Sequence, residues 1–284
     1  GLVGSEMCIR DRMGKKATEV VTGENLDLLI GNIPLEKDSD TSKEEKETIK
    51  ANVLKLLADQ YGIDEEDFQS AELEIVPAGK ARDCGFDRSM VLSYGQDDRI
   101  CAFTSLFAML DAKCGTRTQC CLLVDKEEIG SVGATGMQSK FFENVVAELI
   151  SLEGDYNDLK LRRCLANSKM LSSDVNAGYD PLFADAFEKK NASFCGRGVV
   201  FSKFTGSRGK SGSNDANAEY IAKLRKIMDD NNVHYQMAEL GKVDVGGGGT
   251  IAYIMSLYGM EVIDCGVAVS YTHLRAHETG AYLV

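Results

Sequence analysis

The sequence of 284 residues contains no tryptophan and only 3 prolines, and no stretch approaches 18 uninterrupted apolar residues. A membrane-spanning helix needs an apolar run of about that length, so the sequence argues against one. With 44% hydrophobic residues the chain can bury a core, which argues against disorder. Basic residues are also scarce, since 32 Lys and Arg face 44 Asp and Glu and give a net charge of −12. This acidic balance argues against nucleic acid or a membrane surface as partner and suits cations, including metals.

The nine cysteines form no CxxC pair, and several lie inside apolar runs. An odd number without paired spacing is typical of reduced thiols rather than of a disulfide framework. The first residues also lack the three-part layout of a secretory signal. We therefore expect a cytoplasmic protein.

Both ends of the chain look foreign to the rest. Residues 1–12 precede Met13 and share no periodicity with the residues after it, and residues 270–284 break off a strand-like run. Both segments resemble translated adapter sequence, and we set them aside in reasoning about the fold. We expect a part of a smaller domain over 13–76 and the main domain over 77–269.

Hydrophobic periodicity predicts the secondary structure. Helical spacing predicts helices over 43–61, from after residue 98 to just before Gly115, over 140–153 and 214–230, and from 249 or 250 to about 259. Short apolar runs predict strands over 73–76, 89–93, 119–124, 168–173, 198–204, 235–239 and 261–264. The continuous run QCCLLV at 119–124 predicts a strand buried on both faces. We also expect the apolar helix faces to lie in the core, including Phe103, Phe107, Leu110, Val145 and Leu149.

Strands that alternate with helices from residue 89 onward predict an α/β fold, with a mostly parallel central sheet sandwiched by helices. Acidic residues follow three of the predicted strands: Asp97 and Asp98, then Asp125, Glu127 and Glu128, then Asp174. A lone acid in such a loop is usually solvated or caps a helix. However, the carboxyl ends of parallel strands meet at one edge of a sheet, where converging carboxylates repel one another and need a cation. A pair of divalent metals would supply it, with one acid left to handle a proton.

Several stretches together resemble the aspartyl aminopeptidase family of dizinc metallopeptidases. The resemblance runs in order across residues 13–269, and its motifs are VPAGKARDCGFDRS (76–89), YGQDDR (94–99), VDKEEIGSVGATGMQS (124–139), SSDVNAGYDP (172–181), KFTGSRGKSGSNDANAE (203–219) and GGGGTIA (246–252). It implies a zinc-peptidase-like fold over 77–269 and the remainder of an inserted dimerisation domain over 13–76. It further implies peptide substrates and a homo-oligomer.

The resemblance also implies roles for individual residues. Asp97 would bridge two zinc ions, Glu128 and Asp174 would each bind one of them, and Glu127 would be the general base. Each zinc in the family also takes one His. The first belongs to an amino-terminal segment that we expect this chain to lack, and the place of the second is taken by His273, within the foreign-looking tail.

Substrate-binding groups are suggested by the residues themselves. Lys203 and Lys210 lie in a Gly/Ser-rich loop and could bind an acidic side chain, although a solvated loop is equally compatible with the pattern. Gly248 and Gly249 precede a predicted helix and could present backbone N–H groups to a carboxylate. The expected function is a zinc aminopeptidase that removes N-terminal Asp or Glu. The alternatives are a broader neutral aminopeptidase, and a catalytically incomplete fragment that acts only as a folded oligomerisation module.

Overall fold

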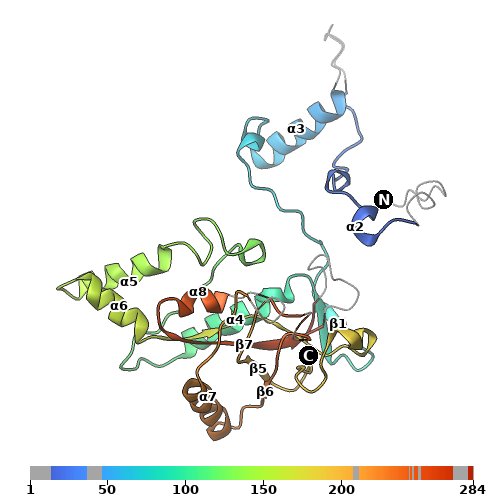
Figure 1. Cartoon of the computed structure of the whole chain (residues 1–284). Coiled ribbons are helices and arrows are strands. Elements are labelled where there is room, and N and C mark those ends of the chain that lie inside the picture. The colour runs from blue at the N-terminus through green and yellow to red at the C-terminus, as the bar shows by residue number, and fades with distance from the viewer. Residues whose placement is uncertain are drawn as a thin grey trace. The chain divides into compact units, whose positions relative to one another are not determined.

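The computed structural model describes residues 14–36, 47–206, 211–242, 244, 246–248, 251–270 and 281–283. The chain forms two compact units, residues 1–76 and 77–284 (Figure 1). No helix among the described residues combines the length and the apolar character that crossing a membrane requires.

The first unit contains short helical elements joined by extended chain. They are α2 (Ala17–Val20), the 3-10 helix η1 (Gly23–Asn25), α3 (Thr48–Tyr61) and the 3-10 helix η2 (Asp67–Gln69). The predicted helix over 43–61 corresponds to α3, and residues 43–46 lie outside the described part. Gly62 ends α3 in the left-handed conformation, at φ 69°, which glycine adopts without steric cost.

The strand predicted over 73–76 is wrong. These residues are extended but belong to no strand, and Leu73 and Ile75 are each 68% exposed. Among the described residues, no ladder pairs with this segment. The apolar residues of this segment therefore form a strand-like pattern, but no second strand pairs with them in the described part of the chain. The assignment of this unit to a dimerisation domain stays a prediction.

The second unit holds the sheets and most of the helices. Its strands are β1 (Arg82–Cys84), β2 (Met90–Ser93), β3 (Lys169–Ser172), β4 (Asn176–Ala177), β5 (Val199–Ser202), β6 (Tyr235–Met237), β7 (Glu261–Val269) and β8 (Ala281–Leu283). Its helices are α4 (Gln96–Asp111), α5 (Phe141–Leu152), α6 (Asp158–Ala166), α7 (Ala218–Asp230) and α8 (Ile251–Ser256), with 3-10 helices η3 (Glu127–Ile129) and η4 (Pro181–Ala186).

The central sheet is mostly parallel, as the sequence predicts. Its strand order is β3–β7–β5–β6, with β4 also paired to β7. The β3–β7, β4–β7 and β5–β6 pairs are parallel, and only β5–β7 among these pairs is antiparallel. A separate antiparallel sheet has the order β1–β2–β8.

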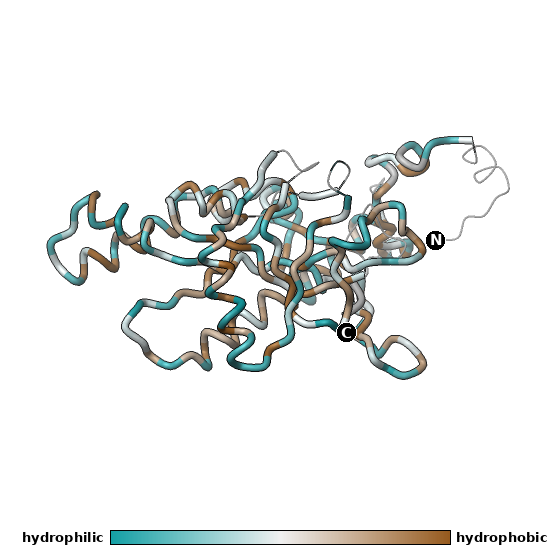
Figure 2. Tube along the Cα trace, turned by 60° about the horizontal axis from the view of Figure 1, so that its bottom comes forward, coloured by the Kyte–Doolittle hydropathy of each residue, from teal (hydrophilic) through white to brown (hydrophobic). Residues whose placement is uncertain are grey.

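Strand β7 is covered on both faces, which makes it the centre of the fold. Val262 packs into a core cluster with residues of α6 and α8, while its neighbour Ile263 packs with Tyr220 and Leu224 of α7. Because successive strand residues point to opposite faces, this alternation places α8 and α7 on opposite sides of the sheet, as Figure 1 shows. The hydrophobic residues of this unit gather along these central strands in Figure 2.

The predicted strand over 119–124 is also wrong. Residues 119–124 are extended without a ladder partner in the described part of the chain. Leu122 and Val124 pack against the core beside Met137, but Leu123 between them is 58% exposed. One face of the run is therefore buried, not two.

The predicted face of α4 is exposed rather than buried, and that of α5 is buried only in part, because Phe142 and Val146 pack against the core while Val145 and Leu149 are exposed. Phe103, Phe107 and Leu110 of α4 are 56%, 58% and 69% exposed, and Val145 and Leu149 of α5 are 39% and 49% exposed. The one buried residue of α4 is Cys101, which shows that α4 turns a different face toward the sheet. Helical spacing identified the apolar stripe correctly but could not say whether another element covers it.

Candidate metal centre

The first acidic pair lies where β2 passes into α4. Gly95 precedes the helix in the left-handed conformation, at φ 71°, and Asp97 and Asp98 have non-helical backbone angles within its first turn. The peptide bond between the two aspartates is cis. The sheet-to-helix turn thus carries two adjacent carboxylates at the carboxyl end of a strand.

Asp174 reaches the same region from β3. It lies between β3 and β4, two strands that both pair with β7. Its Oδ1 atom accepts a hydrogen bond of 2.7 Å from the backbone N–H of Val175. The backbone on either side of Asp174 is therefore fixed to the central strand.

The side chains of Asp97, Asp98 and Asp174 converge. Each offers a carboxylate oxygen, and these oxygens all lie within 4.8 Å of one another. Asp98 Oδ1 is buried and has no hydrogen-bond partner among the residues that the structure describes. A buried carboxylate oxygen without a donor is costly, and a divalent cation satisfies it, so this donor set fits a metal ion.

Two carboxyl groups of this cluster, those of Asp174 and Asp98, have raised pKa values. Burial raises the pKa of Asp174 to about 9, and the charges of Asp97, Asp98 and Glu127 add to the effect. Burial also raises the pKa of Asp98 to about 7, with further contributions from Asp97 and Glu127, against the opposing effect of a hydrogen bond with the Cys101 thiol. Each carboxylate thus needs positive charge to stay ionised here at neutral pH.

Glu127 is held close to these aspartates by a compact loop. It opens the 3-10 helix η3 between Lys126 and Gly130, both in the left-handed conformation. The loop closes on itself through backbone hydrogen bonds from Ser131 to Lys126, 2.7 Å, and from Asp125 to Thr135, 3.1 Å. The negative charge of Glu127 contributes to the raised pKa values of Asp98 and Asp174, so its carboxylate lies within electrostatic reach of both.

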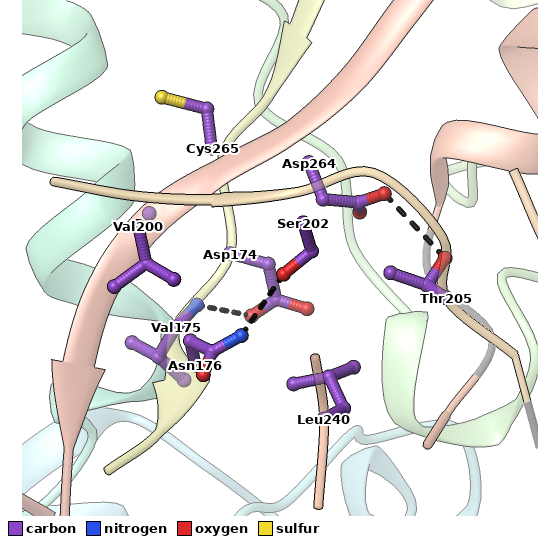
Figure 3. Close-up of a pocket in the computed structure, with 10 residues that line it drawn as sticks. Asp174, Val175, Asn176, Val200, Ser202, Thr205, Leu240, Asp264 and Cys265 are labelled. Carbon is purple, nitrogen blue, oxygen red and sulfur yellow. Dashed lines mark hydrogen bonds between the residues drawn. The ribbon is translucent and has the colours of Figure 1, made fainter. Parts of the chain in front are cut away.

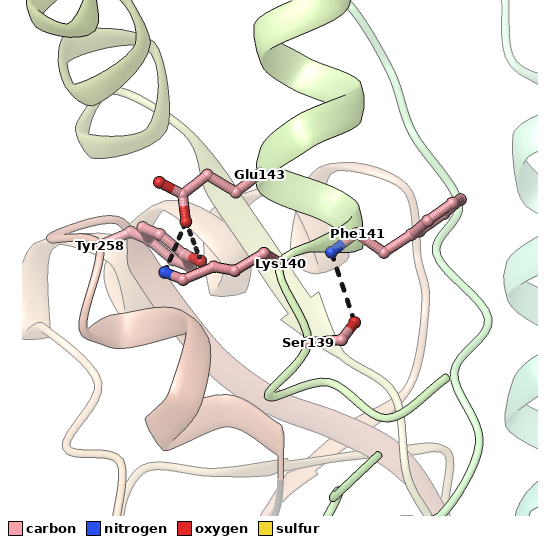
Figure 4. A network of polar contacts seen from close by, with 5 residues as sticks. All are labelled: Ser139, Lys140, Phe141, Glu143 and Tyr258. Carbon is pink, nitrogen blue, oxygen red and sulfur yellow. Dashed lines mark hydrogen bonds and ion pairs between the residues drawn. The ribbon is translucent and has the colours of Figure 1, made fainter. Parts of the chain in front are cut away.

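The end of this loop is anchored to α8 (Figure 4). Lys140 forms an ion pair with Glu143 Oε2 at 2.7 Å, and Tyr258 donates a hydrogen bond of 3.1 Å to the same oxygen. Because Tyr258 follows α8 directly, the network ties the start of α5 to the element that covers the central sheet.

Of the other predicted site residues, Glu128 and Lys203 lie apart from the three aspartates. Glu128 is exposed and does not share the 4.8 Å cluster, although it follows Glu127 directly. Lys203 forms an ion pair with Asp215. Gly248 faces open space, since an added Cβ would meet nothing within 4 Å. Lys210, Gly249 and His273 lie outside the described residues.

The sequence reasoning left Asp98 and Cys101 out of the site. Asp98 was visible as the second acid of the YGQDDR motif, but only Asp97 received a role. Cys101 lies three residues further on, and it is 2% exposed. Its spacing from Asp98, one turn of α4 later, was the signal that the two side chains could meet.

A buried polar network lies behind Asp174 (Figure 3). Asn176 donates a hydrogen bond of 3.1 Å to Ser202, and Ser193 donates one of 2.7 Å to Asn176. Between Asp174 and Asp264 is a cavity of about 10 Å³, the size of one water molecule. The network joins β4, β5 and the chain between them, and so supports the segment that carries Asp174.

Comparison with known proteins identifies the family. The model of the family Aminopeptidase I zinc metalloprotease (M18) matches residues 11–281. The chain is 62% identical over 263 residues to Probable M18 family aminopeptidase 1 of Clostridium acetobutylicum, covering 93% of this chain and 56% of that protein. It is 44% identical over 264 residues to the protein of that name from Thermotoga maritima, covering 93% and 57%.

Solved structures agree with this assignment. The crystal structure of aminopeptidase I from Clostridium acetobutylicum superposes with a TM-score of 0.83 at 58% identity, over 96% of this chain and 57% of that one. The aminopeptidase of Thermotoga maritima gives 0.83 at 41% identity, over 96% and 58%. The chain thus spans a little over half the length of the relatives it matches. It belongs to the M18 family of aminopeptidase I zinc metalloproteases.

Proposed function

We propose that this chain supplies the metal site of a zinc aminopeptidase, which releases the N-terminal residue of peptides by attack of a metal-activated water. The observation that carries the proposal is the convergence of Asp97, Asp98 and Asp174, with the charge of Glu127 beside them. Its family membership supports zinc as the metal and peptides as substrates. The oxygen donors by themselves do not select zinc, because a site of carboxylates also accepts other divalent metals.

We assign separate tasks to the acids. Asp97, Asp174, Glu128 and His273 would hold the zinc ions, with Asp97 shared between two of them. When bound, zinc lowers the pKa of a coordinated water from 15.7 to about 7 and polarises the substrate carbonyl. Glu127 would be the general base, which would accept a proton from the attacking water and deliver it to the amine that leaves. The backbone supports this role, because left-handed residues on both sides of η3 define the short turn that carries Glu127.

The role of Glu127 is tested by Glu127→Gln. Glutamine keeps the size and hydrogen bonding of the side chain but is not a base, so the variant should bind zinc as the wild type does and lose hydrolysis of an aspartyl or glutamyl anilide. Turnover retained in Glu127→Gln would contradict the assignment. Two zinc ions per chain with turnover support the complete site, whereas one or fewer without turnover supports the alternative of a folded oligomerisation module.

We further propose a preference for an N-terminal Asp or Glu, with Lys203 and Lys210 as the cationic groups and Gly248 and Gly249 as backbone donors. The ion pair of Lys203 with Asp215 favours the rival, a broader aminopeptidase, because it offsets the charge that an acidic residue needs. Rates with Asp-, Glu-, Leu- and Lys-anilides separate the two. A faster rate with the Leu-anilide would refute the acidic preference.

We also infer a cytoplasmic homo-oligomer. The eight cysteines that the structure describes are free thiols, which suits a reducing compartment. A Saccharomyces cerevisiae structure of related fold, with a TM-score of 0.61 at 22% identity, is a dodecamer. Light scattering on the purified chain measures the oligomeric state, and a monomer at micromolar concentration would contradict this inference.

A further inference from the structure

One glycine of the central strand lies directly against the backbone of Asp174. Gly266 is extended within β7 and does not adopt a left-handed conformation. A Cβ atom added there would overlap the carbonyl oxygen of Asp174 and lie 2.7 Å from its carbonyl carbon. The backbone conformation does not require glycine at this position. The missing side chain instead leaves the space that the Asp174 backbone occupies.

The same point of β7 also contacts the other half of the acidic cluster. The added Cβ would lie 3.3 Å from Cys101 Sγ. The Cys101 sulfur accepts a hydrogen bond from the backbone N–H of Val267, and its thiol is hydrogen-bonded to the carboxylate of Asp98. The backbone at Gly266 and Val267 thus contacts both Asp174 and Cys101, which lies on the helix that carries Asp97 and Asp98.

This arrangement has a mechanical consequence. Asp174 and Asp98 lie on different segments, and the structure links both to the same two residues of β7. A methyl group at Gly266 cannot be accommodated by a side-chain rotation, because the atoms it meets on Asp174 belong to the backbone. The segment of Asp174 would have to move away from β7, and its carboxylate would move with it.

We propose that Gly266 and Cys101 are positioning residues that set the spacing between Asp174 and the Asp97–Asp98 turn, and thereby the affinity of the site for zinc. The proposal rests on the zinc site proposed above. Neither residue belongs to the cluster of Asp97, Asp98 and Asp174 that would hold the metal, so they would act through these carboxylates. Groups of this kind, which orient metal ligands, typically change metal affinity by about 10- to 100-fold.

The test is zinc affinity, measured by competition with a chelating dye, together with the visible absorption of the Co²⁺-loaded chain. Gly266→Ala should bind zinc at least about tenfold more weakly and give a changed Co²⁺ spectrum. Val262→Ala is the matched control, because Val262 is buried in the same strand but packs with α8. It should lower the thermal midpoint in EDTA and leave the zinc affinity within about twofold of the wild type.

A second pair of variants decides the matter if Gly266→Ala does not fold. Cys101→Ala removes the hydrogen bond to Asp98 and should weaken zinc binding, whereas Cys101→Ser keeps a donor and should restore most of it. Unchanged zinc affinity in Gly266→Ala and Cys101→Ala would overturn the positioning proposal without contradicting the proposed zinc site. An equal loss of affinity in Val262→Ala would also overturn it, since the effect would then be general loosening. A wild-type chain that binds no zinc would overturn both proposals.

Discussion

Replacing Asp174 by asparagine should stabilise the metal-free chain while weakening its metal site. Asparagine has almost the same shape, and its side-chain oxygen can still accept the hydrogen bond from Val175. Burial raises the pKa of Asp174 from 3.8 to about 9, so the folded chain holds a proton that the unfolded chain releases. Below about pH 4, Asp174 is protonated in both states and its ionisation costs the folded chain nothing. The free energy of unfolding then falls as the pH rises from about 4 to about 9.

The size of this effect follows from the pH interval. Between the ordinary pKa of an aspartate and pH 7 lie about 3 pH units, and at about 1.4 kcal/mol for each the cost at pH 7 is about 4 kcal/mol. Solvent reaches part of this half-buried side chain, so about 4 kcal/mol is an upper limit to the gain in Asp174→Asn.

Urea unfolding in EDTA at pH 5 and pH 8 measures the gain, with Asp185→Asn as a control because Asp185 is an exposed acid in η4. Asp174→Asn should be more stable than the wild type at pH 8, with a smaller difference at pH 5. Added zinc should then stabilise the wild type more than the variant. A variant less stable than the wild type in EDTA at pH 8 would refute the reasoning, as would an unchanged slope of stability with pH.

Two further predictions concern protons and the loop of Glu127. Zinc binding near pH 7 should release protons, because Asp98 and Asp174 have pKa values raised to about 7 and about 9 without metal, and zinc affinity should therefore fall as the pH falls. Calorimetry in buffers of different ionisation enthalpy measures the number of protons released, and a release of no protons would contradict the prediction. Gly136→Ala should lower turnover more than zinc affinity, because the added Cβ would overlap the carbonyl oxygens of Ser131 and Val132 and distort the loop that carries Glu127. Anilide kinetics and a zinc titration on the same variant test this prediction, and unchanged turnover would contradict it.

The sequence predicted the central sheet well because its signal is local. In β7, the adjacent apolar residues Val262 and Ile263 each face a helix, and a pair of this kind indicates a strand that is buried on both faces. The run at 119–124 gave the same signal without a strand, because pairing depends on a neighbour that the run itself does not encode. The stripe of Phe103 and Phe107 failed for a similar reason, since burial depends on what packs over it.

The candidate site shows the same division. Acids at the ends of strands were expected to converge because parallel strands end at one edge. The structure brings Asp97 and Asp174 together, but for another reason, since Asp97 follows β2 of the antiparallel sheet and Asp174 follows β3 of the central one. The choice between neighbouring acids was harder. Asp98 joins the cluster and Glu128 is exposed, and the direction of a side chain in a turn follows from backbone angles that residue types do not reveal. The fit between Gly266 and Asp174 joins residues far apart in the chain, so no local pattern could show it.

The most direct measurement is zinc bound per chain at equilibrium, counted by dialysis against buffered zinc for the wild type, Asp97→Ala and Asp174→Asn. If the converging carboxylates form the metal centre, the wild type binds zinc tightly and each variant loses most of it while keeping its circular dichroism spectrum. Variants that retain the zinc content of the wild type would contradict the account, because the acids would then lie together without binding the metal.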